Sequence, residues 1–123
     1  MNAPDFSLPA SRRLKRSADF RRVQGGGRRV HSRDIVVLYL PGLGSESRVG
    51  FTVSRKVGGA VVRNRVKRWL REAARHERHH LRGVWDVVII ARPSAATAGA
   101  HALRGQVRRA FRRVETRPDR RQR

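Results

Sequence analysis

The chain has 123 residues, and its 30 lysines and arginines against nine carboxylates give a formal net charge of +21. It contains no cysteine, which excludes a disulfide framework, a cysteine-ligated zinc site and a thiol nucleophile. So large a positive charge destabilises the free compact chain through self-repulsion, and we therefore expect a polyanionic partner.

The length predicts a single domain, with three segments along the chain. Residues 1–13 are expected to be a flexible lead-in, 14–114 one folded domain and 115–123 a basic tail, because the two ends lack apolar content. The longest apolar run, 35–40, is too short to span a membrane, and the first ten residues show no signal peptide. We therefore expect a cytoplasmic protein without membrane contact.

The first half of the domain predicts one short helix followed by strands. The helix covers about 17–24, with Ser17 as its cap, Asp19 in its first turn and three glycines after it. A weak strand is expected at 28–31. A stronger one covers 34–40, where apolar residues occupy both faces. A third strand covers 48–54 and alternates apolar residues with Gly50 and Thr52.

A long helix is predicted from about Val61 to His80, with Gly83 as the stop signal. Its apolar stripe consists of Val62, Val66, Trp69, Leu70 and Ala73. Its opposite face consists of Arg63, Asn64, Lys67, Arg68, Arg71, Arg75 and Arg78, and Arg65 lies on a flank near Glu72. Ordinary solvated faces mix both signs of charge, whereas this face has no carboxylate, so we interpret it as a polyanion-binding surface.

A third apolar run, 86–91, predicts a central strand that is covered on both faces. The last helix covers about 99–114 and buries four apolar residues, Leu103, Val107, Ala110 and Phe111. Strands 48–54 and 86–91, joined through the long helix, imply a parallel pair. The predicted class is α+β, with helices packed on one sheet.

No catalytic set is visible in the sequence. The carboxylates are scattered, and the helical spacing of His76, His79 and His80 hints at a metal without supplying a closed set of ligands. The loop 55–59 before the long helix could hold a phosphate at the helix N-terminus, or it could be an ordinary flexible turn. Phe20 could be a core residue or a stacking platform for an unpaired base.

Four blocks of the chain, in order, resemble the bacterial ribonuclease P protein subunit. The hallmark is Arg-Asn-Arg within VGGAVVRNRVKR at 57–68. The other blocks are LKRSADF at 14–20, RVGFTVSRK at 48–56 and DVVIIAR at 86–92. The resemblance covers about residues 14–113.

This resemblance implies a fold and a function that composition does not show. The fold is a two-layer αβββαβα sandwich with a left-handed βαβ crossover, like domain 2 of ribosomal protein S5, although the general rule favours a right-handed one. The family removes the 5′ leader of precursor tRNA as an endoribonuclease. The chemistry belongs to a catalytic RNA with bound magnesium, and the protein, which needs no protein partner, binds that RNA and the leader.

The resemblance also assigns residues by position. The expected contacts to the catalytic RNA are Arg55, Lys56, Arg63, Asn64, Arg65, Lys67, Arg68 and Arg71. The expected contacts to the leader are Phe20, Gln24, Leu38 and Tyr39, on the sheet face near the first helix.

Three positions depart from the family pattern. Gln24 and Leu38 stand where aromatic residues are usual, with Tyr39 one residue later on the opposite face, and Gly59 replaces an asparagine. The alternatives are a small ribosomal or other structural RNA-binding protein without a role in cleavage, and a DNA-binding regulator. No helix-turn-helix pair precedes the basic helix, which argues against the regulator.

Overall fold

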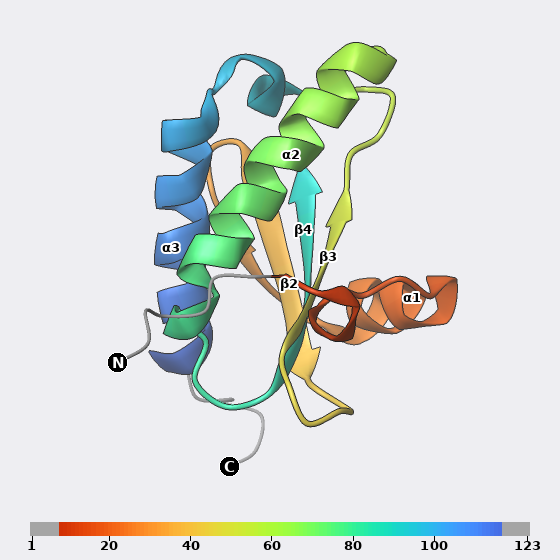
Figure 1. The fold of residues 1–123 in the computed structure, drawn as a ribbon, viewed down its shortest axis with the longest axis vertical. Helices are drawn as coiled ribbons and strands as arrows, with labels where there is room; N and C mark the ends of the chain where they lie inside the picture. Colours follow the sequence, from red (N-terminus) through yellow and green to blue (C-terminus); the bar gives the residue numbers. More distant parts are fainter. Residues whose placement is uncertain (1–7, 117–123) are drawn as a thin grey trace.

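The computed structural model describes residues 8–116. In chain order, the elements are η1 (Ala10–Arg12), α1 (Ser17–Gly26), β1 (Arg28–His31), β2 (Ile35–Pro41), β3 (Arg48–Thr52), α2 (Ala60–Glu77), η2 (Arg78–His80), β4 (Trp85–Ala91), η3 (Pro93–Thr97) and α3 (Ala100–Thr116). Helices α2 and α3 pack on one face of a single sheet, and the shorter α1 packs on part of the other face (Figure 1).

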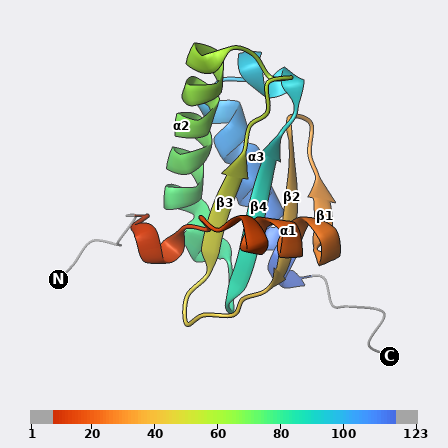
Figure 2. The same ribbon diagram turned by 90° about the vertical axis from the view of Figure 1, so that its right-hand side faces the viewer.

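The four strands lie in the order β1-β2-β4-β3. Strand β2 is antiparallel to both its neighbours, and β3 is parallel to β4, as the strand–helix–strand pattern predicts. In Figure 2, seen from the α1 side, the chain leaves β3, passes behind the sheet through α2 and returns in β4 one place to the right. Seen from the helix side this step runs to the left, so the crossover is left-handed, an exception to the general rule.

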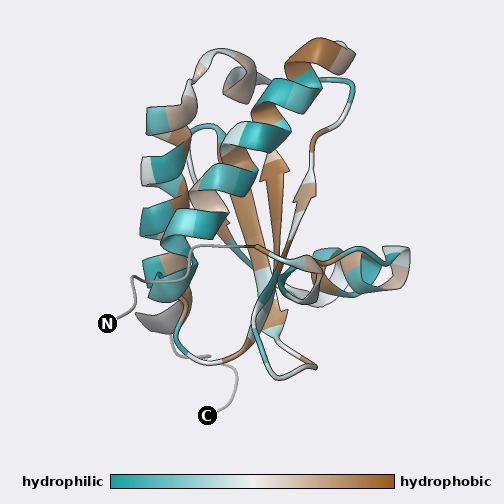
Figure 3. Cartoon of the chain, viewed as in Figure 1, coloured by the Kyte–Doolittle hydropathy of each residue, from teal (hydrophilic) through white to brown (hydrophobic). Residues whose placement is uncertain are grey.

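The alternation of the strands builds a separate core on each face of the sheet. Ile35, Val37 and Tyr39 of β2 lie in the main core beneath α2 and α3. Leu38, between them, lies in a smaller core beneath α1 together with Val23. Strand β4 contributes to both cores, which confirms its prediction as a central strand. Figure 3 shows the strands as hydrophobic and the outward surfaces of α2 and α3 as hydrophilic.

Apart from those of β1, the strand boundaries differ from the predicted ones by one or two residues, and the helices α1 and α2 differ in ways that have a physical cause. Helix α1 continues through the first two glycines, and its C-cap is Gly27, whose amide donates to the Val23 carbonyl at 2.7 Å. A Cβ at Gly27 would lie 2.3 Å from that carbonyl oxygen, so the close approach requires glycine. Arg16, and not Ser17, occupies the N-cap of α1. Helix α2 ends at Glu77, and the three residues after it form the 3-10 helix η2.

The ordered chain also begins earlier than the predicted residue 14. Residues 10–12 form η1, and Arg13 bridges to Val49 of β3. The side chain of Arg12 donates to Glu46 at 2.9 Å, which ties this segment to the loop before β3. The predictions for residues 1–7 and 117–123 lie outside the described residues. Within 8–116, no helix combines the length and the apolar character that crossing a membrane requires.

A buried carboxylate joins α2 to α3. Glu77 is 2% exposed and accepts a 2.6 Å hydrogen bond from Arg104. Burial alone would raise the pKa of the Glu77 carboxyl, but the hydrogen bond from Arg104 and the charges of Arg104, Arg108 and His80 outweigh it. The pKa therefore lies below its usual 4.5. Ionised Glu77 stabilises the fold above that value, and this stabilisation is lost as the pH falls through the lowered pKa.

Replacing Glu77 by glutamine should remove this part of the acid sensitivity. The difference in unfolding free energy between wild type and Glu77→Gln should shrink as the pH falls below about 5, where the Glu77 carboxyl becomes protonated. Urea unfolding at a series of pH values measures the difference. The exposed Glu72→Gln is the control, with a smaller effect. A difference that did not change with pH would contradict the assignment.

Candidate RNA interface

Helix α2 presents a basic surface to solvent because most of its apolar residues turn inward; Val61, in the first turn, is exposed. Val66, Leu70 and Ala73 are buried against the sheet and α3. The opposite side carries the residues that we call the α2 face, which are Arg63, Asn64, Lys67, Arg68 and Arg71; all are exposed except the half-buried Arg63. Their side chains follow successive turns of one rigid helix, an arrangement suited to several phosphates along an RNA backbone.

Three predicted members of the basic surface are engaged within the protein. The guanidinium of Arg65 lies 5.3 Å from the ring centre of Trp69 and donates to the Ala96 carbonyl at 3.4 Å. Arg75 bonds the exposed Glu72 at 2.6 Å, so the outward side does include a carboxylate. Trp69, expected in the core, is only half-buried.

Arg78 is the third of these residues. Its guanidinium donates to the Ser47 carbonyl at 3.1 Å and thereby connects η2 to the start of β3. The continuous basic surface therefore ends near Arg71, earlier along the helix than the sequence pattern predicts.

The turn between β3 and α2 adds two exposed cations, Arg55 and Lys56. The turn is anchored because buried Val57 donates its amide to the Ser54 carbonyl at 3.0 Å. The turn leads into the first residues of α2 (Figure 1), so these two exposed cations lie close to the start of that helix. Gly59 is the N-cap of α2 and makes no side-chain cap bond.

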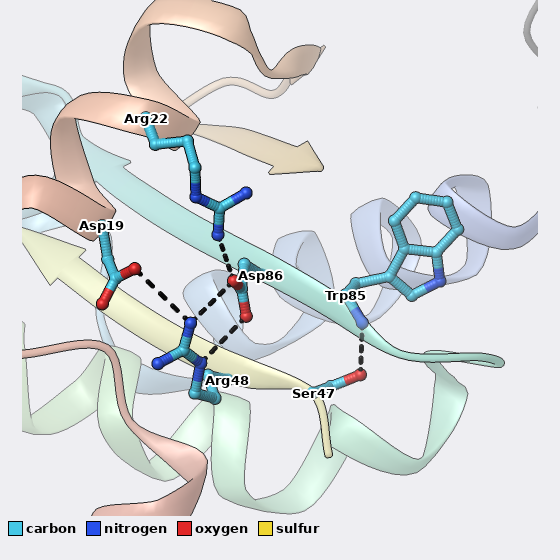
Figure 4. Close-up of polar contacts among 6 residues, drawn as sticks. All are labelled: Asp19, Arg22, Ser47, Arg48, Trp85 and Asp86. Carbon is cyan, nitrogen blue, oxygen red and sulfur yellow. Dashed lines mark hydrogen bonds and ion pairs between the residues drawn. The ribbon is translucent and has the colours of Figure 1, made fainter. Parts of the chain in front are cut away.

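A network centred on Asp86 holds α1 against the face of the sheet (Figure 4). Asp86 is fully buried at the start of β4 and receives two hydrogen bonds from Arg48 of β3, at 3.0 and 2.8 Å. Arg22 of α1 donates to the same carboxylate. Asp19 of α1 lies 3.5 Å from Arg48. One buried carboxylate therefore connects α1, β3 and β4, and sets the orientation of α1.

The ring of Phe20 packs directly over Gly50 of β3. A Cβ at Gly50 would lie 2.5 Å from the ring and 3.0 Å from the side chain of Leu14. The glycine within a predicted strand thus marks a close approach between α1 and the sheet. Phe20 is half-buried, so one part of the ring belongs to the small core and another faces outward. The core interpretation therefore holds for part of the ring, and stacking of a base on its outward part stays a prediction.

We expect Gly50→Ala to displace Phe20, because the added methyl group occupies space that the ring now fills. The displacement should lower the free energy of unfolding by about 1–3 kcal/mol, as is typical of overpacking, and should weaken any ligand that contacts the ring. Urea unfolding measures the first effect. Gly44→Ala, where nothing lies within 4 Å, is the matched control. Equal stability of the two variants would contradict this packing.

Two of the predicted leader contacts are buried. Leu38 is 1% exposed beneath α1. Tyr39 is 2% exposed on the other face of the sheet, where its ring packs edge-on against Trp85. Neither side chain offers a surface to a nucleotide, so these two assignments were wrong for this chain. The cause is packing, since α1 covers Leu38 and the main core encloses Tyr39.

Beside α1, the sheet keeps a half-exposed surface that we call the α1-side cleft. It consists of Phe20, Gln24, Val36, Thr52 and Ile90. Gln24 donates to the Thr52 hydroxyl at 3.3 Å, so its amide is held at the edge of the cleft. Val36 and Ile90 face each other across β2 and β4. The sequence did not predict Val36 and Ile90 as contacts. The alternation of side chains along a strand assigns each residue to one face of the sheet, but it does not show how much of that face a helix covers.

A hollow of about 170 Å³ joins the two surfaces. Lys67 and Arg71 of the α2 face line one side of it, and Phe20 lines the other. Arg13 and Lys15, from the segment before α1, add two further cations. A nucleic acid that leaves the α2 face would therefore reach the α1-side cleft without a break in positive charge.

The three histidines do not converge on one point. His80 lies 3.2 Å from Glu77, His76 lies 3.8 Å from Glu72, and the ring centre of His79 lies 4.1 Å from that of His80. Within residues 8–116, no group of three or more histidines and carboxylates is arranged to hold a metal ion.

The sequence is similar to that of known proteins of one family. The family model described as Ribonuclease P matches residues 8–115. The Ribonuclease P protein component of Caldanaerobacter subterraneus subsp. tengcongensis is 40% identical over 102 residues, covering 83% of this chain and 88% of the relative. That of Gluconacetobacter diazotrophicus is 44% identical over 108 residues, covering 85% and 92%.

The fold is also similar to solved structures of the same family. The RNase P protein of Staphylococcus aureus superposes with a TM-score of 0.76 at 30% identity, over 85% of this chain and 95% of that one. The RNase P protein of Thermotoga maritima gives a TM-score of 0.75 at 29% identity, over 84% and 97%.

The α+β sandwich with a basic helix beside an open sheet face, together with the family match, places the chain among small RNA-binding proteins of ribonucleoproteins. The match over residues 8–115 and the 44% identity to one relative specify the family. The chain belongs to the ribonuclease P protein component family.

Proposed function

We propose that this chain is the protein subunit of ribonuclease P and assists removal of the 5′ leader from precursor tRNA in the cytoplasm. The family match over residues 8–115 is the observation that carries this proposal. The α2 face would bind the catalytic RNA through phosphates, with Arg55 and Lys56 extending the contact. Arg65, directed toward Trp69, would support that surface from its edge.

The α1-side cleft would bind the leader. An unpaired base could stack on the outward part of Phe20, while Gln24 would offer its amide and Val36 and Ile90 an apolar floor. The hollow lined by Lys67 and Arg71 lies between this cleft and the α2 face, and its cations would neutralise phosphates where the leader passes close to the catalytic RNA. This division explains why one small domain needs both a basic helix and an open sheet face.

The chemistry would belong to the RNA subunit. The magnesium that such an endoribonuclease uses would be held mainly by that RNA, as the resemblance implies. The protein would raise the affinity for substrate and for those ions by neutralising phosphates nearby. No protein partner is required in this scheme.

The direct test is cleavage of a precursor tRNA by the cognate catalytic RNA at low magnesium, with and without the purified chain. Addition of the chain should increase the rate at subsaturating substrate, and the gain should be smaller for a precursor whose leader is shortened to one nucleotide. No gain in cleavage would reject the proposal. Stable cosedimentation with ribosomal subunits in its place would favour a ribosomal role.

A further inference from the structure

A second basic groove lies beside β1. Strand β1 forms the edge of the sheet opposite β3 (Figure 2). Its volume is about 770 Å³. The turn between β1 and β2 forms one wall, and the flank of α3 that faces this turn forms the other. None of the groove residues belongs to the α2 face or the α1-side cleft, so the proposed function does not account for this groove.

The groove is open because the flank of α3 carries small residues. Ala102 and Gly105 line it, and Gly105 lies in the middle of a 17-residue helix, where glycine costs about 1 kcal/mol relative to alanine. A Cβ at Gly105 would lie 3.3 Å from the guanidinium of Arg109 and 3.9 Å from that of Arg108. The absent side chain therefore leaves space for two guanidinium groups along the helix.

The lining is strongly basic. Its ionisable members are His31, Arg33, Asp34, His101, Arg108, Arg109 and Arg113. The single carboxylate, Asp34, is 5% exposed and is held in the floor by Gln106, which donates to it at 2.6 Å and accepts the Asp34 amide at 2.9 Å. Arg33 and Arg109, by contrast, are exposed at the rim, one on each wall. The charge presented to solvent is therefore positive.

The wall that carries Arg33 is held in place by backbone hydrogen bonds. The Ser32 amide donates to the Ile35 carbonyl at 2.9 Å, and the Arg92 amide donates to the Asp34 carbonyl at 2.9 Å. The second bond fixes the turn to the end of β4. The two walls therefore keep their separation, which lowers the entropy cost of binding an extended ligand.

We propose that this groove binds a second segment of the catalytic RNA through its phosphates. The ligand should be anionic and extended, since the stretch of α3 from His101 to Arg113 spans about 18 Å. The groove lies at the β1 edge of the sheet, away from the α2 face, so a structured RNA bound to the α2 face would extend across the protein to reach it. This inference rests on the proposed function and adds a second point of attachment to it.

The first test removes the two rim cations together. Arg33→Ala/Arg109→Ala should weaken binding to the catalytic RNA and should reduce the slope of log affinity against log salt by about 2, one for each phosphate that is no longer neutralised. The matched control is Arg82→Ala/Arg112→Ala, which removes two exposed arginines outside the groove. Thermal unfolding verifies that both double variants fold.

The second test locates the RNA and uses the absence of cysteine from the chain. A hydroxyl-radical probe attached to Ala102→Cys, in the groove wall, should cleave the catalytic RNA at a defined place in the complex. The same probe on the exposed Ser45→Cys, in the loop between β2 and β3, should not cleave there.

The outcomes separate this inference from the proposed function. If wild type stimulates cleavage but Arg33→Ala/Arg109→Ala binds the catalytic RNA with unchanged affinity and salt slope, the groove is not an RNA site and only this inference fails. Cleavage of precursor tRNA from position 102, and not of the catalytic RNA, would also overturn it. If wild type fails to bind the catalytic RNA at all, the proposed function fails first.

Discussion

Replacing Asp86 by alanine should destabilise the protein by about 3 kcal/mol. This buried carboxylate connects Arg22 and Arg48, and its removal leaves two cations without their shared partner. Breaking a buried pair by removing one side typically costs about 3–5 kcal/mol. The lower end applies because the two arginine side chains remain 30% and 24% exposed and can be partly solvated. Urea unfolding, followed by tryptophan fluorescence, measures the change.

Asp19→Ala is the matched control for this change. Asp19 touches the same network only through its 3.5 Å contact with Arg48, so its loss should cost less than about 1 kcal/mol. Asp86 also orients α1. The protein should increase the cleavage rate more for a precursor with a full leader than for one with a shortened leader, and Asp86→Ala should reduce this difference more than Asp19→Ala does. If the two variants were equally stable, the network would not hold α1 as the geometry indicates.

The second large effect is expected on RNA affinity. Arg68→Ala/Arg71→Ala removes two exposed cations of the α2 face and should weaken binding to the catalytic RNA by roughly tenfold or more at about 200 mM salt. The salt slope should fall by about 2, because two phosphate contacts no longer release counterions. Stability should change by less than about 0.5 kcal/mol, since both side chains are exposed. Filter binding over a salt series measures both the affinity and its slope.

The control is again Arg82→Ala/Arg112→Ala, which leaves the α2 face intact while removing the same charge. A general effect of net charge would lower the affinity of both double variants equally. A local contact surface lowers only the affinity of Arg68→Ala/Arg71→Ala. An unchanged salt slope in that variant would mean that the α2 face does not contact the RNA backbone.

Local patterns were sufficient to predict most elements of this fold. Apolar residues on both faces of 34–40 require a strand that is covered on both faces, and β2 is one. The amphipathic periodicity of 61–80 requires a helix with an apolar side buried, and α2 buries Val66 and Leu70. In each case a short-range repeat determines the structure, because side chains alternate every 2 residues in strands and repeat about every 3.6 in helices.

The hand of the βαβ crossover could be predicted only from the resemblance to a known family, because no local sequence signal determines it. The left-handed crossover contradicts the general preference, and nothing in the periodicity of residues 48–91 indicates its hand. Several assignments also required the packed structure. Arg75 and Arg78 share the helical periodicity of Arg68 and Arg71, yet both are bonded within the protein. Arg75 bonds Glu72, one turn earlier on the same helix. Arg78 bonds the Ser47 carbonyl, which is distant in sequence and lies beside the end of α2 only in the folded chain.

For the candidate site, too, some properties follow from the sequence and others only from the tertiary structure. Composition and helical spacing alone establish a cysteine-free, strongly basic chain with one cationic helix face and therefore a polyanionic partner, because charge and period are local properties of residues. The tertiary structure decides which side chains a partner can reach. It buries Leu38 and Tyr39, leaves Val36 and Ile90 half-exposed, and places Arg33 opposite Arg109 across a groove. Exposure depends on which element covers a residue, and that is settled by contacts between segments far apart in the chain.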